Sequence, residues 1–359
     1  MPVTGREHMY SRLTRTTAML AGLMLSGQMA LAQANLTVET SSAGNSPHLS
    51  TLHLADVVGR MGIANLQVQE GQTATNSMLN VAEGKSDIVT APTLLHFLLE
   101  KGRGPFSSVG ERGQEIAPNV KVLYTYNAGA YGLFAPVVSG INSYTDIKGR
   151  TIWNGPPSGA ALTVGRQTLQ LGSNGFKDGE DYKGLQTNWG QLPTALVDGS
   201  AEAFMVPITF PSDRVVTALA AGNVNIISFP KEIWESEGMQ KFLKAPGNAP
   251  VVIKGEEMGY AAGSGVTLIS EDGMFRSPGV PFATVARADL PDDVVKAIVA
   301  AYIDTLPELK TRSPYAANVN YDVVDADVTG LCNGLSLKYH PGAIAAWEDA
   351  GYAIPDCAK

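Results

Sequence analysis

Cysteine is scarce in this chain of 359 residues, which has only two, Cys332 and Cys357, both near the C-terminus. They do not form a C-x-x-C motif, so the sequence gives no support for redox catalysis. In an exported chain such a pair indicates a structural disulfide, although two free thiols remain the alternative. The bond would close a loop of about 25 residues and stabilise the fold by roughly 3 kcal/mol.

Long apolar runs are absent beyond the N-terminal region, and residues 18–30 form a run too short to span a bilayer. Three arginines precede this run, and two A-x-A sites follow it within residues 30–34. This order is typical of a secretory signal peptide, here residues 1–34, with cleavage near Gln33 or Asn35. A retained membrane anchor is the alternative. We therefore expect a soluble exported protein in the periplasm.

Positive charge is also in short supply: 26 lysines and arginines face 34 aspartates and glutamates, for a net charge of -8. Loss of residues 1–34 removes three arginines and one glutamate, which moves the net charge to about -10. No basic cluster compensates for this excess. Since nucleic acid is bound mainly through its phosphates, a nucleic acid partner is not expected.

Catalytic signatures are missing. The chain has no G-x-S-x-G elbow, no H-E-x-x-H pair, no paired Cys/His spacing, no P-loop and no G-x-G-x-x-G fingerprint. Asp325 and Asp327 resemble a carboxylate pair, but we interpret them as part of a solvated loop. We therefore expect neither an enzyme nor a metal or cofactor site.

The five histidines have mostly ordinary interpretations. His8 lies in the predicted signal peptide, while His53 and His96 are expected to be packing or surface residues of helices. His340 precedes Pro341 and is expected to begin a helix. His48 follows the Ser46-Pro47 helix start and is the one histidine that we expect to point into a cleft.

Strand-like and helix-like segments alternate through most of the chain, which predicts an α/β fold with largely parallel sheets. The expected strands are 36–40, 66–69, 87–90, 120–126, 133–138, 150–154, 185–188, 203–206, 224–229 and 282–287. The main expected helices start near 47, 75, 92, 159, 192, 212, 290 and 341. Residues 243–281 are rich in Gly and Pro and predict long loops or short strands.

Several strand-to-helix turns are small, uncharged and rich in Gly, Ser, Thr or Pro: 42–50, 90–93, 155–161 and 187–190. Ordinary tight turns are the simpler interpretation, but several such turns together favour a binding cleft. Free backbone N–H groups at a helix start attract anions. Because no lysine follows Gly155-Pro156-Pro157-Ser158-Gly159, we expect a carboxylate there, held by backbone donors and the Ser158 hydroxyl.

These turns and their neighbours supply the candidate ligand-binding residues. Trp153 is expected in the core, and Trp189 either in the core or in the cleft, whereas Arg166 is expected to face solvent. Arg214 follows Thr209-Phe210-Pro211 and is a candidate partner for a second carboxylate. The full candidate set is Asn45, Ser46, His48, Ala91, Tyr126, Ser158, Gly159, Ala160, Trp189, Thr209, Phe210 and Arg214.

Five ordered segments resemble the TAXI-type solute receptors of tripartite ATP-independent periplasmic (TRAP) transporters: 145–150, 155–159, 196–204, 285–291 and 340–343. The resemblance implies a two-lobed periplasmic binding fold, type II-like, with the ligand cleft between the lobes. It implies a small organic acid or amino acid as ligand, no cofactor, and a TRAP-type membrane permease driven by an ion gradient as partner.

The resemblance also implies the limits of the lobes. Lobe one would comprise 36–133 and 283–359, lobe two 134–282, and strands crossing near 134–135 and 282–283 would form the hinge. The turns at 42–48 and at Ser158-Gly159-Ala160-Ala161 depart from the usual Gly-Thr-rich forms. We therefore expect the anion site to be kept while its specificity shifts from glutamate toward a simpler carboxylate.

Other functions remain open from the sequence. The binding protein of an ATP-driven (ABC) importer shares the fold and the style of these turns. A periplasmic enzyme on the same scaffold would need an acid and a base, for which only His48 with Asp213 or Glu202 can be proposed. A ligand-sensing module that reports to a membrane kinase is the third alternative.

Overall fold

The computed structural model describes residues 34–41, 43 and 45–359. The predicted signal peptide therefore lies outside the described residues, except for Ala34, which begins the first strand. Within the described ranges, none of the helices is both long and apolar enough to cross a membrane.

One mixed sheet of twelve strands organises the described chain, in the order β2-β1-β3-β11-β4-β7-β5-β6. Strands β12 and β8 also pair with β4, β10 pairs with β8, and β9 pairs with β11. The strands are β1 Ala34–Glu39, β2 Ala64–Gln69, β3 Ile88–Pro92, β4 Val120–Pro136, β5 Thr151–Gly155, β6 Lys183–Gln186, β7 Ala203–Ile208, β8 Val224–Ile227, β9 Pro250–Lys254, β10 Val266–Ile269, β11 Met274–Arg287 and β12 Lys338–Tyr339.

Helices connect and cover these strands. They are α1 Ser46–Arg60, α2 Ala74–Ala82, α3 Thr93–Glu100, α4 Arg112–Ile116, α5 Ala160–Gly172, α6 Leu192–Ala195, α7 Asp213–Ala218, α8 Lys231–Glu235, α9 Glu237–Leu243, α10 Asp292–Asp304, α11 Leu306–Thr311, α12 Ala326–Thr329 and α13 Pro341–Asp349. Several begin directly after a strand, so the strand-to-helix turns gather at the carboxyl ends of the strands.

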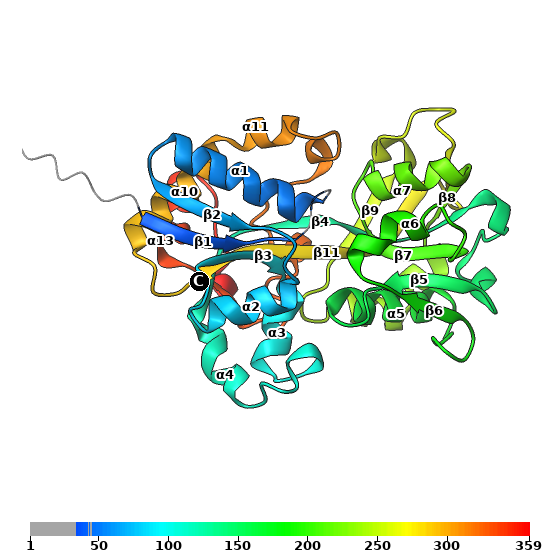
Figure 1. The fold of residues 1–359 in the computed structure, drawn as a ribbon, viewed down its shortest axis with the longest axis horizontal. Coiled ribbons are helices and arrows are strands. Elements are labelled where there is room, and N and C mark those ends of the chain that lie inside the picture. The colour runs from blue at the N-terminus through cyan, green and yellow to red at the C-terminus, as the bar shows by residue number, and fades with distance from the viewer. Residues whose placement is uncertain (1–33, 42, 44) are drawn as a thin grey trace, which may run out of the picture. The chain divides into compact units, whose positions relative to one another are not determined.

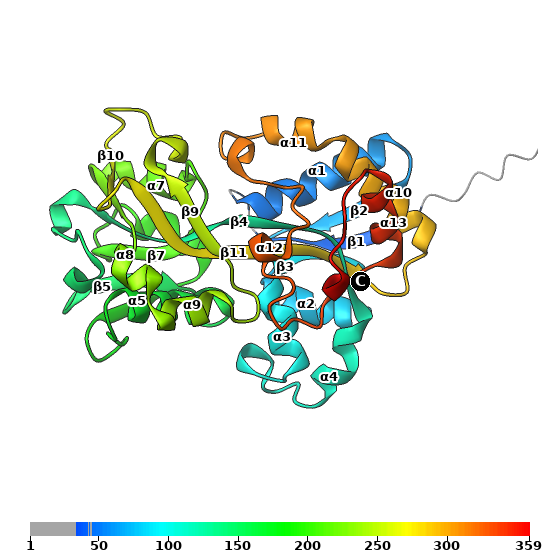
Figure 2. The ribbon, with the colours of Figure 1, turned by 180° about the vertical axis from the view of Figure 1, so that it is seen from behind.

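Lobe one is the group of elements around the largest apolar cluster, which includes Val38 of β1, Val57 of α1, Val122 of β4 and Val285 of β11. Helices α1, α10 and α11 lie on one side of strands β1 to β3, and α2 and α3 lie on the other (Figures 1 and 2). Alternating strand residues thus find apolar partners on both faces of the sheet.

Lobe two is the group around two smaller clusters, one on each face of strands β5, β7 and the far half of β4. Helices α5, α8 and α9 contribute Val164, Trp234 and Met239 to one cluster. Helices α6 and α7 contribute Leu192 and Val215 to the other. The predicted α/β fold with two lobes is confirmed. The sheet is mixed rather than largely parallel, because β11 runs antiparallel to β3 and β4, and β4 runs antiparallel to β7.

Strands β4 and β11 take part in both lobes and pair with each other, Phe282 opposite Tyr126 and Gly279 opposite Ala130. The separate strands predicted at 120–126 and 133–138 are one strand, because the small residues between them stay extended. Gly129 is required there: its φ is 135°, and a Cβ would lie 2.0 Å from the Ile208 carbonyl oxygen. The predicted strand 282–287 likewise starts earlier, at Met274, in a stretch whose prolines concealed it.

The predicted lobe limits stay a prediction, although Tyr131 and Leu133, assigned to lobe one from the sequence, pack in a lobe-two cluster. The prediction of a single helix from about 290 to 309 is wrong. This segment forms two helices, α10 and α11, which are separated at Thr305 because Pro307 lacks the N–H needed to continue a helix. Helix α1 is capped by Asn45 rather than Ser46, with the Asn45 side chain accepting a hydrogen bond from His48 N at 3.0 Å.

The predicted disulfide between Cys332 and Cys357 is present, with the two Cα atoms 5.8 Å apart. It joins the loop after α12 to the last turn of the chain, Asp356–Ala358. The enclosed segment holds β12 and α13, whose Tyr339 and Trp347 are buried in lobe one. The bond therefore secures the C-terminal segment to its own lobe.

Candidate functional site

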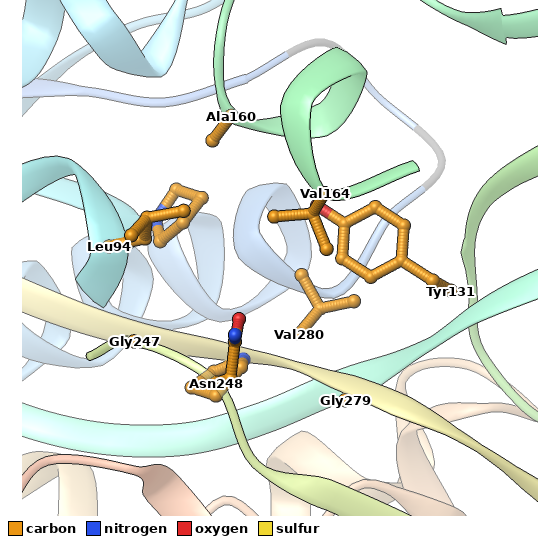
Figure 3. Close-up of a pocket in the computed structure, with 10 residues that line it drawn as sticks. Leu94, Tyr131, Ala160, Val164, Gly247, Asn248, Gly279 and Val280 are labelled. Atoms are coloured by element: carbon orange, nitrogen blue, oxygen red, sulfur yellow. The ribbon is translucent and has the colours of Figure 1, made fainter. Parts of the chain in front are cut away.

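A small cavity lies where the two lobes meet, beside the crossing of β4 and β11. Its volume is about 10 Å³, which is room for about one water molecule. Figure 3 shows Leu94 of α3 on one side and Val164 of α5, Val280 of β11 and the Tyr131 ring on the other. The lining residues are Pro92, Leu94, Tyr131, Ala160, Val164, Gly247, Asn248, Gly279, Val280 and Pro281.

Arg214, at the start of α7, is the most informative of the predicted residues. Its guanidinium donates a hydrogen bond to the Pro207 carbonyl and lies over the Trp189 ring, 4.7 Å from the ring centroid. Trp189 is held in turn by Trp153, with ring centroids 5.3 Å apart, and Trp153 Nε1 donates to Thr187 Oγ1 at 2.7 Å. The buried Trp153 thus anchors the aromatic face that positions Arg214.

The Arg214 guanidinium forms no ion pair within the part of the chain that the structure describes. The arginines at 60, 112, 150, 166, 276, 287 and 312 all do. Burial lowers the pKa of Arg214 to about 10, so it stays charged at neutral pH. A half-buried cation that lacks a carboxylate partner is an expected feature of an anion site.

Arg214 is electrostatically linked to the cavity through Tyr131. Pro207, whose carbonyl accepts from Arg214, pairs with Tyr131 across β7 and β4, and Tyr131 lines the cavity. Burial raises the pKa of Tyr131, and the Arg214 charge acts in the opposite direction. The cation and the cavity therefore lie within electrostatic reach of each other.

The start of α5 borders the same cavity. Gly159 is its N-cap, with φ of 103° and no side-chain hydrogen bond to the helix start, and Ala160 lines the cavity. Ser158 is exposed. The gap between this loop and lobe one is narrow, since a Cβ on Gly159 would lie 3.7 Å from Thr75 Oγ1 of α2.

The start of α1 holds three other predicted residues, which contact other groups of the protein. Asn45 caps the helix, and Ser46 Oγ donates to the Ala128 carbonyl at 3.4 Å. His48 Nε2 lies 3.1 Å from a Glu70 carboxylate oxygen, although the geometry is not that of a hydrogen bond. We take this pair as a contact of two neighbouring side chains.

Two predicted residues are fully buried in lobe one. Ala91 is a core residue of β3, and Tyr126 shares a 3.0 Å hydrogen bond with Ser50. On lobe two, Thr209 Oγ1 donates to the Pro211 carbonyl, and Phe210 packs against Phe275. The structure thus brings Trp189 and Arg214 together on lobe two. It places Ala91 and Tyr126 in the lobe-one core, and Ala160 packs in the same apolar cluster.

The lining residues Leu94, Tyr131, Val164, Asn248 and Val280 were not predicted from the sequence. The apolar ones follow ordinary core patterns, and Asn248 lies in a segment expected to be loop. Only their position at the end of a helix or at the strand crossing distinguishes them, which a linear pattern does not show.

His48 and Glu202, one of the two pairs that an enzyme could use, each have another partner. His48 faces Glu70, whereas Glu202 accepts from Arg150 Nη1 at 2.8 Å and from the Thr151 backbone N–H at 2.9 Å. Across the same part of the chain, no cluster of His, Cys, Asp and Glu has the arrangement of a metal site.

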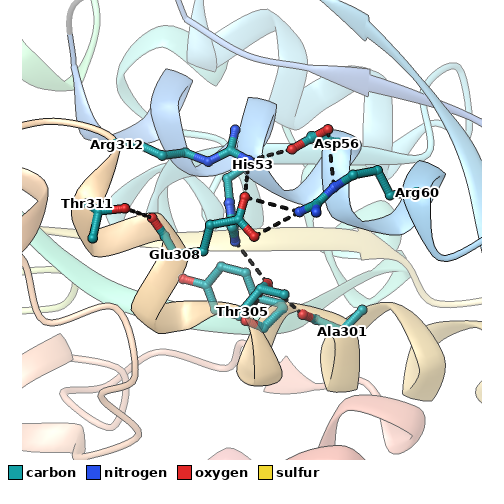
Figure 4. Close-up of polar contacts among 9 residues, drawn as sticks. His53, Asp56, Arg60, Ala301, Thr305, Glu308, Thr311 and Arg312 are labelled. Atoms are coloured by element: carbon teal, nitrogen blue, oxygen red, sulfur yellow. Dashed lines mark hydrogen bonds and ion pairs between the residues drawn. The ribbon is translucent and has the colours of Figure 1, made fainter.

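His53 is a packing residue between α1 and the α10–α11 junction (Figure 4). Its Nε2 lies 2.9 Å from Thr305 Oγ1, whose own proton goes to the Ala301 carbonyl at 2.7 Å. Nε2 therefore donates, and the unpartnered Nδ1 carries no proton. Burial, followed by the nearby Arg312 charge, lowers the pKa of His53 to about 4.

The other two described histidines are also structural. His96 Nε2 lies 3.0 Å from the Ala117 carbonyl, and burial lowers its pKa. His340 caps α13, accepting from Gly342 N at 3.2 Å, as expected for a residue that begins a helix. Arg166 is exposed, as expected, and it also pairs with Asp178 at 2.7 Å.

The chain belongs to the NMT1-like family, whose model matches residues 49–351. No curated protein matches the sequence.

Among solved structures, the chain is similar to the periplasmic ectoine-binding protein of the TeaABC TRAP transporter of Halomonas elongata (12% identity, 88% of this chain and 90% of that chain, TM-score 0.43). It is also similar to DctP7 of Bordetella pertussis, an extracytoplasmic solute receptor binding pyroglutamic acid (12%, 89% and 93%, TM-score 0.44). A third is the periplasmic nitrate-binding protein NrtA of Synechocystis PCC 6803 (10%, 87% and 72%, TM-score 0.43). At these scores the structures identify neither the solute nor the type of transporter.

Proposed function

We propose that this protein is the periplasmic receptor of a TRAP-type transporter of the TAXI class, and that it captures a small organic anion for ion-coupled uptake. The anion is a carboxylate, a keto acid or an amino acid. The protein performs no chemistry on it and delivers it to a membrane permease. The motifs at 145–150, 155–159 and 285–291 support this type of receptor over that of an ABC importer.

The observation that carries the anion assignment is the Arg214 guanidinium. It is half-buried, fixed by the Pro207 carbonyl and the Trp189 face, and forms no ion pair with any acid of the described chain. A carboxylate that pairs with it would complete its hydrogen bonds while the site excludes water. Charge-assisted pairs of this kind are among the strongest polar contacts in proteins.

The helix start of α5 supplies a second attraction. A helix of 13 residues with no side-chain cap leaves backbone N–H groups unsatisfied at its positive end. Because Ala160 lines the cavity, an anion bound nearby is within the field of these donors. The exposed Ser158 hydroxyl adds one further donor at the entrance.

Ligand binding would favour the closed arrangement of the lobes, because the ligand contacts both. The hinge would lie where β4 and β11 cross, at residues 127–130 and 279–281, since these positions pair with each other between the two groups of elements. The position 134–135 expected from the sequence is less suitable, since Phe134 already pairs with Phe204 inside lobe two.

A thermal-shift screen of the refolded, ligand-stripped mature protein tests this function. Small mono- and dicarboxylates, keto acids and amino acids are compared with sugars and cations. We expect a rise in melting temperature of several degrees with a few related acids, since a ligand that binds the native state stabilises it by mass action. A response to neutral or cationic compounds alone would contradict the proposal.

Variants locate the anion. Arg214→Gln should weaken binding of the active acid by about 10- to 100-fold, the usual range for a lost charge-assisted hydrogen bond. Arg103→Gln is the matched control, because Arg103 is exposed and has no ion pair among the described residues. Ser158→Ala should weaken binding modestly and Ser158→Asp should abolish it. Normal binding by the Ser158→Asp variant would show that the anion lies elsewhere.

A further inference from the structure

We propose that the solute carries a single negative charge on an uncharged, largely apolar body, and that the site discriminates against dianions and zwitterions. This inference rests on the proposed function and narrows it. It follows from the composition of the cavity wall and from the number of cations near it.

The wall of the cavity contains no charged side chain. Leu94, Val164 and Val280 supply methyl groups, Pro92, Ala160 and Pro281 supply further apolar surface, and the Tyr131 ring closes one side. Val164, Val280 and Tyr131 are each at most 4% exposed. A charged group of the ligand placed among them would lose its water without gaining a counter-charge.

The site has too little positive charge to balance a second carboxylate. Among the described residues, Arg214 is the one whose charge acts on Tyr131 of the cavity wall, and the α5 helix start supplies only about half a positive charge. One carboxylate is neutralised by this pair of features. A second carboxylate would be buried without a partner, which is strongly unfavourable.

An ammonium group would also lack its partner. None of the ten lining residues is acidic, and Asp213, the acid whose charge acts on Arg214, is exposed to solvent. The bound amino acid would have to bury its cation beside Arg214 or against methyl groups. Both arrangements disfavour a zwitterion relative to the matching keto or hydroxy acid.

Asn248 provides the one polar amide in the wall. Its side chain points toward the cavity in Figure 3, and its Nδ2 donates to the Phe242 carbonyl at 2.9 Å, which fixes the amide plane. It can exchange one hydrogen bond with an uncharged carbonyl or hydroxyl of the ligand. Gly247 brings this segment against α3: its φ is 75°, and a Cβ would lie 2.6 Å from Leu94 Cα.

The cavity itself is too small for a ligand, so an apolar body must enter while the lobes are apart. Its wall belongs to both lobes, with Leu94 on α3 and Val164 and Val280 on lobe two. Separation of the lobes widens the space, and closure then packs the ligand between these methyl groups. The ligand's apolar part therefore contributes to closure, and a polar part would oppose it.

Three matched ligands test the inference by isothermal titration calorimetry on the stripped protein. 4-Methyl-2-oxopentanoate is a monoanion with a branched apolar body, 2-oxoglutarate is a dianion of similar length, and L-leucine is the zwitterion of the same carbon skeleton. We expect the monoanion to bind at least about 100-fold more tightly than either of the others.

Variants of the wall provide a second readout. Val164→Ala should weaken binding of 4-methyl-2-oxopentanoate by about 3- to 10-fold, since it removes methyl contacts, and should leave pyruvate nearly unaffected. Val280→Ala serves the same purpose if the first variant does not fold. Val252→Ala is the control, because Val252 is exposed on β9, outside the cavity.

The outcomes separate this inference from the proposed function. If 2-oxoglutarate or leucine binds as tightly as the monoanion, the inference is overturned and the receptor function stands. If none of the three binds while a neutral or cationic compound does, both are overturned. A clear preference for the monoanion that Val164→Ala reduces and Val252→Ala does not would support the inference.

Discussion

The disulfide between Cys332 and Cys357 allows a quantitative test of how the C-terminal segment is held. It encloses a segment with a sequence separation of 25 residues. In the chain-entropy description, a loop of this length restricts the unfolded chain by about 3.5 kcal/mol at 25 °C. Loss of the bond should lower the free energy of unfolding by up to this amount.

The corresponding change in melting temperature follows from the entropy of unfolding. At about 2.1 cal/mol/K per residue, roughly 325 ordered residues give about 0.7 kcal/mol/K. The double variant Cys332→Ser/Cys357→Ser should therefore melt about 5 °C below the oxidised protein. Differential scanning calorimetry of both ligand-stripped proteins measures this difference, and reduced wild type serves as a second comparison.

The same variant should bind the solute almost normally. Neither cysteine lines the cavity, and the neighbouring Asn333 reaches the Asn248 carbonyl through a long hydrogen bond of 3.4 Å from its Nδ2. We expect the dissociation constant to change by less than about threefold. A melting shift below about 1 °C would refute the loop-entropy argument, and a complete loss of affinity would refute a purely structural role for the bond.

Two further predictions concern pH and closure. Because the pKa of His53 is lowered to about 4, the unfolded chain binds more protons than the folded protein between pH 6.5 and 4. The free energy of unfolding is therefore highest above this range and decreases as the pH falls through it. Urea unfolding should show about 2 kcal/mol less stability at pH 5 than at pH 7 from this group, and His53→Gln should remove that difference; an unchanged pH slope would contradict the assignment. Asn318 Nδ2 donates to the Phe210 carbonyl at 2.8 Å between lobe one and the loop before α7, so Asn318→Ala should weaken solute binding by about 3- to 10-fold through loss of closure. Equal affinity of this variant and wild type, measured by calorimetry, would show that the bond does not distinguish the closed form.

Local patterns predicted most of the elements. Alternating apolar residues located strands such as β1 and β7, and the helix starts expected near 159 and 341 are those of α5 and α13. The predictions failed where tertiary pairing overrides a local signal. Gly129 and Pro278 interrupt the hydrophobic pattern of β4 and β11, yet these segments stay extended because each is paired with a neighbouring strand.

The site residues also include some that the sequence placed correctly and some that it did not. Arg214, Trp189 and Ala160 were identified because each adjoins a strand-to-helix turn, and such turns gather at the carboxyl ends of the strands. Tyr126 and Ala91 lie in similar turns or strands but are buried, because their side chains face the lobe-one core. Which side of a strand faces the ligand depends on the sheet around it.

The sequence by itself determined the α/β class, the absence of common catalytic motifs and the positions of most helix starts, because each depends on residues close together in the chain or on composition. It also favoured a disulfide over two free thiols, which the structure confirmed. Only the tertiary structure decided that Leu94, Val164, Asn248 and Val280 share one cavity and that Arg214 lacks an acid partner among the described residues. Those properties come from contacts between segments far apart in sequence, and the crossing of β4 and β11 is what brings these segments together.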